Sequence, residues 1–183
     1  MSGTEVTPLP ESEIERLREM FDRSPVALTL ADALQDDAPL IVANRAFLDL
    51  TGYSRSEVIG RNCRFLQSDL DNETQRAAIR DSMQHHAQRE VVLRNRRKDG
   101  TVFDNMLFLN TLVDRNGQAR FFLGSQFLLE RQTTPMQIDR HIHFLDAAAE
   151  RALEATHLLR AEQRLTLANA AHAVASAWLT LRS

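Results

Sequence analysis

The side chain with the greatest potential reactivity is the thiol of Cys63, the only cysteine among 183 residues. A lone cysteine is most often a small buried hydrophobe without reactivity. The neighbours of this one indicate otherwise. Asn62 and Arg64 flank it just after Gly60, where a helix is predicted to stop and an apolar core residue would not normally lie. An arginine beside a thiol also indicates an anionic neighbour. A single cysteine excludes an internal disulfide and any multi-cysteine zinc or iron–sulfur site.

The elements that must position this segment are short strands and helices. Apolar runs bounded by turn residues predict strands at 26–31, 40–43, 90–97, 101–111 and 119–129. Helical patterns between the second and third strands predict helices at 46–50, 54–59 and 72–86. The Asp99-Gly100 pair is a strong hairpin signal. This order predicts an α+β fold, with a five-stranded antiparallel sheet that carries helices on one face.

Helical extensions are predicted on both sides of this core. Residues 11–22 repeat apolar side chains at helical spacing, after a capping box that pairs Ser12 with Glu15. The last 48 residues (136–183) hold 12 alanines and no glycine or proline, which favours helix. The chain is therefore divided into an N-terminal tail and amphipathic helix, a core and a C-terminal extension of two helices, at 1–23, 24–130 and 131–183.

Two apolar stripes follow the C-terminal extension. The first stripe comprises Ile138, Ile142, Leu145, Ala149, Ala152 and Leu159. The second stripe comprises Leu165, Ala168, His172, Ala175 and Leu179. Together with the helix at 11–22 they exceed what one sheet face needs, which favours a homodimer; the alternative is that they cover the sheet of their own chain. Trp178 is either an interface anchor or a core contact.

Composition excludes several classes of protein. The chain is 43% hydrophobic and 26% charged, with a net charge of −3, which is ordinary for a soluble domain and unlike a nucleic-acid binder. No apolar run approaches the roughly 18 residues that span a bilayer, and the N-terminus has no signal-peptide stretch. We therefore expect a cytoplasmic protein that binds neither a membrane nor nucleic acid.

The run GRNCRFLQ, residues 60–67, matches the signature of the LOV domains, the flavin-binding blue-light sensors of the PAS superfamily. The sequences NRAF at 44–47 and LTGYS at 50–54 resemble the segment that PAS domains place after their second strand. FLGSQ at 122–126 resembles the family's closing strand. The resemblance covers roughly residues 24–130, and the whole chain resembles the short bacterial LOV proteins that lack a fused effector domain.

The resemblance implies non-covalent FMN in the dark. Under blue light it implies a reversible bond between the Cys63 sulfur and the flavin C4a carbon, while the flavin N5 takes a proton. No enzyme activity and no catalytic base are expected. Gln126 can donate to N5 in one state and accept from it in the other, so a flip of its amide is the expected relay. The signal then passes through the flanking helices as a change in dimerisation or in contacts with a downstream protein partner.

A flavin ring has a flat apolar body and one polar edge, so its pocket needs aliphatic walls and amides. Asn95 and Asn105 fall on adjacent strands, where they can read the polar edge. Leu66, Ile79, Leu107, Leu109 and Phe122 can supply the walls, and the resemblance adds Asn62, Gln67 and Gly124 as further cofactor-binding residues.

Three arginines are candidates for the phosphate end. Arg64 and Arg80 match the family's phosphate-binding arginines, and a guanidinium suits a phosphate bidentately. Arg76 lies one helical turn before Arg80, where many relatives have an apolar residue. It either adds a phosphate contact, favours a longer flavin nucleotide, or faces water.

The sequence also departs from the family pattern. Ala31 stands where plant relatives usually have threonine, Leu107 replaces a common phenylalanine, and the loop at 35–38 lacks an obvious asparagine counterpart. We expect these changes to leave flavin binding intact and to affect the photoproduct lifetime and the polar network.

Other functions remain as alternatives. A light-independent flavin-binding PAS sensor of redox state or ligand needs no thiol, and a structural dimerisation module predicts colourless protein. No acidic residue follows any histidine of the C-terminal extension, as a kinase phosphoacceptor requires; these are His141, His143, His157 and His172. The balanced charge of the extension also argues against a helix-turn-helix DNA reader.

Overall fold

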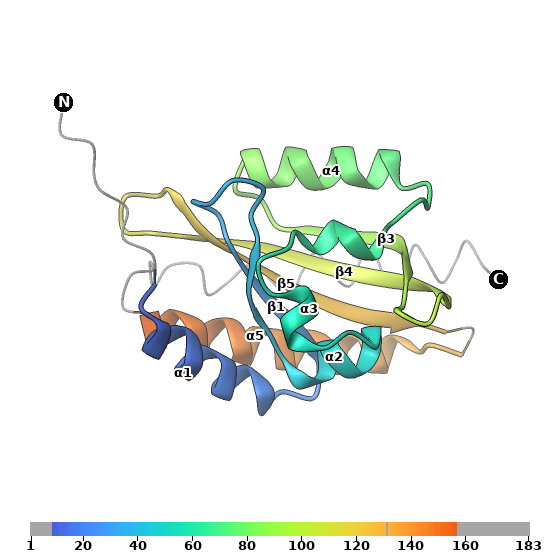
Figure 1. Cartoon of the computed structure of the whole chain (residues 1–183), viewed down its shortest axis with the longest axis horizontal. Helices are drawn as coiled ribbons and strands as arrows, with labels where there is room; N and C mark the ends of the chain where they lie inside the picture. Colours follow the sequence, from blue (N-terminus) through green and yellow to red (C-terminus); the bar gives the residue numbers. More distant parts are fainter. Residues whose placement is uncertain (1–8, 131, 157–183) are drawn as a thin grey trace.

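One antiparallel sheet forms the centre of the molecule (Figure 1). The computed structural model describes residues 9–130 and 132–156. Its strands are β1 (Ala27–Asp32), β2 (Leu40–Ala43), β3 (Arg89–Arg96), β4 (Val102–Val113) and β5 (Ala119–Leu129). They pair in the order β2-β1-β5-β4-β3, so β5 is the central strand. The predicted α+β fold with a five-stranded antiparallel sheet is confirmed.

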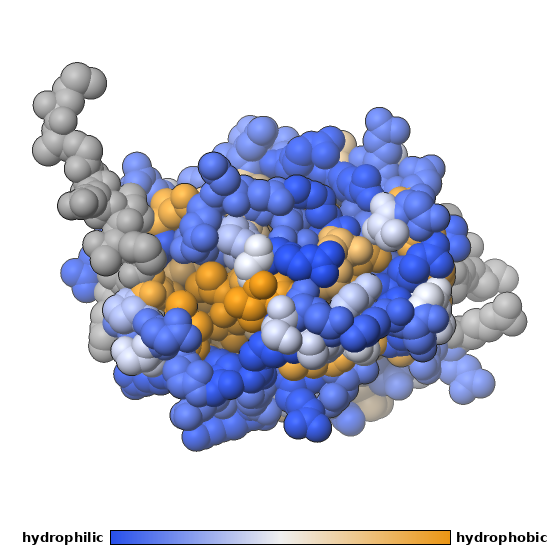
Figure 2. Space-filling view, in the orientation of Figure 1, coloured by the Kyte–Doolittle hydropathy of each residue, from blue (hydrophilic) through white to orange (hydrophobic). Residues whose placement is uncertain are grey.

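Helices cover both faces of this sheet (Figure 1). Between β2 and β3 the chain forms α2 (Arg45–Thr51), α3 (Arg55–Val58), the 3₁₀ helix η1 (Cys63–Leu66) and α4 (Glu73–Gln84) on the inner face. Helices α1 (Glu11–Asp22) and α5 (Pro135–Thr156) pack together on the outer face. The outward surface of α4 is hydrophilic (Figure 2). No helix among the described residues has the length and apolar content to cross a membrane.

Side-chain alternation along the strands divides the core into two clusters. On β5, Phe121 and Leu123 belong to the outer cluster with α1 and α5, whereas Phe122 belongs to the inner cluster. The same alternation on β4 sends Phe108 outward and Leu109 inward. Each strand therefore carries one set of residues toward the helices of the core and another toward the extensions.

Helix α5 uses the first apolar stripe to cover the sheet of its own chain. Ile138 and Leu145 are fully buried in the outer cluster, together with Ile142, Ala149 and Ala152. This is the packing that the sequence left open as an alternative to a dimer contact. Leu159, the second stripe, His157 and Trp178 lie outside the described residues.

Two predicted helix caps have different outcomes. The capping box at α3 is confirmed, with the Ser54 backbone N–H donating to Glu57 Oε2 at 2.8 Å. The capping box at Ser12 and Glu15 is wrong, because α1 already begins at Glu11 and has Pro10 at its N-cap without a side-chain hydrogen bond. Proline favours the start of a helix through its fixed φ, so the chain enters the helix before Ser12 can cap it.

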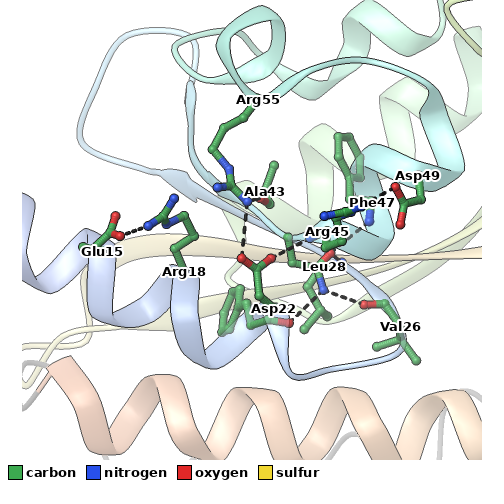
Figure 3. A network of polar contacts seen from close by, with 12 residues as sticks. Glu15, Arg18, Asp22, Val26, Leu28, Ala43, Arg45, Phe47, Asp49 and Arg55 are labelled. Atoms are coloured by element: carbon green, nitrogen blue, oxygen red, sulfur yellow. Dashed lines mark hydrogen bonds and ion pairs between the residues drawn. The ribbon is translucent and has the colours of Figure 1, made fainter.

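The end of α1 is tied to the core by the buried side chain of Asn44. Its Oδ1 accepts from the backbone N–H groups of Leu28 and Phe47, at 2.9 and 3.0 Å. Its Nδ2 donates to the carbonyls of Phe21 and Val26, at 2.9 and 2.8 Å. The amide thus uses its full hydrogen-bonding capacity. Figure 3 shows the surrounding network, which joins the end of α1 to β1, β2 and α2.

Replacing Asn44 by alanine is expected to destabilise the whole domain. The change leaves four backbone groups without their partner in the core, so the free energy of unfolding should fall by about 3–5 kcal/mol in urea unfolding. Asp49→Ala, which breaks the exposed pair with Arg45, is the control and should cost less than ~1 kcal/mol. Equal effects of the two changes would show that Asn44 does not tie α1 to the core.

Candidate functional site

A cavity of about 650 Å³ lies against the inner face of the sheet. Its walls come from β1, β3, β4 and β5, from η1 and α4, and from the loop after β1. This volume is within the range of small-molecule and cofactor pockets.

The structure brings almost all the predicted site residues to this one cavity. The cavity is lined by Asn62, Cys63, Arg64, Gln67, Arg76, Ile79, Arg80, Asn95, Asn105, Leu107, Leu109, Phe122, Gly124 and Gln126. Leu66 is the exception and corrects the expectation that it forms a wall. Its side chain is 1% exposed and packs in the same inner cluster as the lining residues Leu109 and Phe122, but it does not line the cavity itself.

Further cavity residues were missed from the sequence. They are Thr29, Ala33, Gln35, Asp37, Ala38, Leu40, Met83 and Leu93. Alternation along the strands was the available signal for two of them. Thr29 lies two residues before Ala31 on β1, and Leu93 two before Asn95 on β3, so each pair shares a face. The loop residues carry no comparable signal.

One side of the cavity carries three buried amides. Asn95, Asn105 and Gln126 are 3%, 1% and 3% exposed. The Oδ1 atoms of both asparagines and the Oε1 atom of Gln126 have no hydrogen-bond partner among the described residues. Native proteins leave few buried polar atoms unpaired, because each costs free energy. Three such oxygens in one cavity indicate a ligand that brings hydrogen-bond donors.

The Gln126 amide is held weakly on its other side. Its Nε2 donates to Thr29 Oγ1 at 3.4 Å, and this hydroxyl donates to the carbonyl of Gly124, also at 3.4 Å. A Cβ at position 124 would lie 2.8 Å from Thr29 Oγ1 and 3.2 Å from Gln126 Nε2. Glycine is therefore the residue that leaves room for both side chains.

Cys63 is the first residue of η1 and lines the same cavity. Its side chain is half-buried, with the cavity on its open side. Burial raises the pKa of the Cys63 thiol to about 12, so the sulfur keeps its proton at neutral pH. Asn62 fixes the segment, because its Oδ1 accepts from the Arg64 backbone N–H at 2.9 Å and its Nδ2 donates to the Asp37 carbonyl.

Positive charge gathers at one end of the cavity. Arg64 forms an ion pair with Asp37, and Arg76 Nε donates to Gln67 Oε1. Arg80 is exposed at the cavity edge and makes no ion pair within the described residues. A second hollow of about 580 Å³ adjoins this end and adds Arg61. Among the described residues, Asp37 is the only acidic one that lines either hollow, so this end attracts an anion.

Comparison with known proteins shows to which family the chain belongs. Residues 25–127 match the PAS domain family. The chain is 38% identical over 131 residues to blue-light-activated histidine kinase 2 of Erythrobacter litoralis, which covers 70% of this chain and 38% of that protein. It is 33% identical over 121 residues to a blue-light photoreceptor of Listeria monocytogenes, which covers 66% of this chain and 47% of that one. The chain thus spans less than half the length of these curated relatives.

Two solved structures of LOV proteins are also similar to this chain. The LOV protein of Rhodobacter sphaeroides superposes with a TM-score of 0.79 at 37% identity, over 93% of this chain and 98% of that one. The LOV domain of the Erythrobacter litoralis histidine kinase EL346 superposes with a TM-score of 0.57 at 41% identity, over 60% and 100%. The chain therefore belongs to the LOV family of PAS-domain blue-light photoreceptors.

Proposed function

We propose that the chain binds FMN without a covalent bond in the dark and links it reversibly to Cys63 under blue light. The observation that carries this proposal is that Cys63 and the three unpaired amide oxygens line one cavity. The role proposed is that of a cytoplasmic sensor without enzyme activity, in which residues 24–130 detect light and the flanking segments transmit the change.

The lining of the cavity fits a flavin. The polar edge of the ring presents one N–H donor between two carbonyl acceptors, and the amides of Asn95 and Asn105 can both donate and accept. Their unpaired oxygens supply the acceptor that the N–H group needs. Leu107, Leu109 and Phe122 supply apolar surface for the ring body. The predicted departures at Ala31 and Leu107 keep an apolar lining at both positions.

The protonated thiol suits the proposed bond. When bound, FMN supplies absorption of blue light and, in its excited state, an electrophilic C4a carbon beside a basic N5 nitrogen. The S–H bond of Cys63 breaks, its proton passes to N5, and the sulfur bonds to C4a; the reverse steps restore the thiol in the dark. The high pKa of Cys63 keeps this proton on the sulfur until then, so no side-chain base is required.

Gln126 is the proposed relay. Its Nε2 can donate to N5 before the proton transfer, and its Oε1 can accept from N5–H afterwards. The unpaired Oε1 and the long hydrogen bond from Nε2 to Thr29 support such a turn. A rearranged hydrogen bond is typically worth about 0.5–1.5 kcal/mol, enough to shift a population about 2- to 10-fold. The output is therefore a biased equilibrium rather than unfolding.

The arginines at the positive end are proposed to hold the FMN phosphate. Arg80 is available for it, and Arg64 can exchange the Asp37 carboxylate for a phosphate, to which it can bind with two hydrogen bonds. Arg76 is held by Gln67 next to them, where it adds charge to this end.

A homodimer is the proposed output state. Within the described residues, α1 and α5 pack on the outer sheet face. The proposal assigns the second apolar stripe, which is known from the sequence alone, to the contact between two copies. A second copy of the chain offers the same stripe, and a dimer that changes with light can then engage or release a downstream protein.

Removing the sulfur tests the central bond. Cys63→Ala and Cys63→Ser are expected to purify with the yellow colour of the starting protein but to keep their absorption spectrum under blue light. The unchanged protein should bleach and recover in darkness. Reversible bleaching in either variant would contradict the bond to sulfur and favour a flavin sensor that does not use the thiol.

Removing the arginine at the cavity edge tests the phosphate site. Arg80→Ala should weaken FMN binding roughly 10- to 100-fold, the range for a lost charged hydrogen bond, and leave riboflavin binding unchanged. Fluorescence titration of the unfolded and refolded protein with each flavin measures both constants. Arg94→Ala, an exposed change on β3, is the control. A parallel loss for riboflavin would place Arg80 outside the phosphate site.

Molar mass in solution tests the dimer. Light scattering of the whole chain should give twice 20.8 kDa in one light state and a different share of dimer in the other. Leu165→Glu combined with Leu179→Glu should give single chains, because it places charge in the second stripe, whereas Gln163→Glu should not. A single chain of 20.8 kDa in darkness and in light would refute the dimer.

A further inference from the structure

The outer face of β5 carries a polar contact directly behind the Gln126 amide. Ser125 is fully buried, and its Oγ lies 2.5 Å from Nε2 of His141 on α5. Neighbouring residues of a strand point to opposite faces, so Gln126 lines the cavity while Ser125 meets the C-terminal helix. One peptide unit of the central strand thus separates the cavity from α5.

His141 is held in a tight apolar site. Its ring is 6% exposed and lies between Phe108 of β4, with ring centroids 5.4 Å apart, and Phe127 of β5, at 5.0 Å and nearly perpendicular. Burial lowers the pKa of His141 to about 4, so the ring is neutral at neutral pH and Nε2 can either donate to the Ser125 hydroxyl or accept from it. The neighbouring α5 residues Ile138, Ile142 and Leu145 are buried in the outer apolar cluster, where packing contacts carry no direction.

The geometry points to Ser125 and His141 as the positioning pair that couples the state of Gln126 to helix α5. A directional hydrogen bond fixes one register of α5 on the sheet, whereas apolar contacts allow the helix to slide. A turn of the Gln126 amide changes its bond to Thr29, and Thr29 is bonded to the carbonyl of Gly124. The backbone at 124–126 then shifts against β1 and moves Ser125 Oγ relative to His141. This inference rests on the proposed function, in which Gln126 responds to light.

The proposed role also accounts for a histidine, rather than an apolar residue, at position 141. A phenylalanine at 141 would fill the space between Phe108 and Phe127 equally well, so packing alone does not require an imidazole. Helix α5 begins six residues before His141, so a small displacement there acts on the start of the extension that carries the proposed dimer contact.

The experiment compares His141→Phe, Ser125→Ala and Gln126→Leu in the whole chain, with His143→Phe, an exposed change on the same helix, as the control. Absorption spectra report bleaching and recovery. Hydrogen–deuterium exchange of the α5 backbone, in darkness and under blue light, reports how well the N–H groups of the helix are protected.

His141→Phe and Ser125→Ala should bleach and recover normally, yet reduce the light-minus-dark difference in α5 exchange roughly 2- to 10-fold, the factor of one hydrogen bond. His141→Gln, which restores a side-chain donor and acceptor, should recover part of that difference, and His143→Phe should retain it.

A second measurement decides the inference even if the protein shows no photochemistry. Nitrogen-15 shifts of the His141 ring, recorded in darkness, should move when Gln126 is changed to leucine and should not move in Thr134→Ala, a change at the start of α5 that leaves β5 intact. The coupling would be overturned if His141→Phe kept the full light-minus-dark difference in α5 exchange. It would also be overturned if the nitrogen-15 shifts of the His141 ring stayed the same in Gln126→Leu. Absence of bleaching in the unchanged protein would instead overturn the proposed function.

Discussion

The structure depends on one constraint, which is that three buried amide oxygens on β3, β4 and β5 have no hydrogen-bond partner in the described part of the chain. Unpaired polar atoms in an interior are costly, so a ligand that brings hydrogen-bond donors is favoured at this place. The sheet register sets where they stand. Leu93 pairs with Asn105 and Asn95 lies two residues further on, so both amides face the cavity from adjacent strands. The Cys63 thiol and the arginines that line the same cavity add two further requirements, a site that can react with sulfur and a negative charge.

Local sequence patterns predicted the elements well because their causes are local. Alternating apolar residues and the Asp99-Gly100 turn mark the strands, and Glu57 three residues after Ser54 marks the start of α3. The same pattern failed at Ser12, where Pro10 starts the helix first. The eight-residue signature predicted Cys63 and Arg64, which line the cavity, and Leu66, which does not. The amides Asn95, Asn105 and Gln126 were predicted from their places on the last three strands, and they also line it.

Long-range contacts were beyond what the sequence could predict. Asn44 was seen only as part of a family segment, yet it joins α1, β1 and α2, because its partners lie up to 23 residues away. Asp37 likewise pairs with Arg64 across a loop that offered no motif. His141 was considered only as a phosphoacceptor and proves to be a buried partner of Ser125. Which face of α5 meets which residue of β5 depends on packing between distant segments, and neither periodicity nor composition specifies it.

The most direct test of the account is whether the Cys63 proton leaves the sulfur under blue light. A light-minus-dark infrared difference spectrum of the purified protein records the S–H stretching band, and with one cysteine in the chain the band has a single source. The account predicts a thiol band in darkness that disappears on illumination and returns as the yellow colour recovers. A flavin that bleaches while the S–H band stays unchanged, or a protein without an S–H band in darkness, would contradict it.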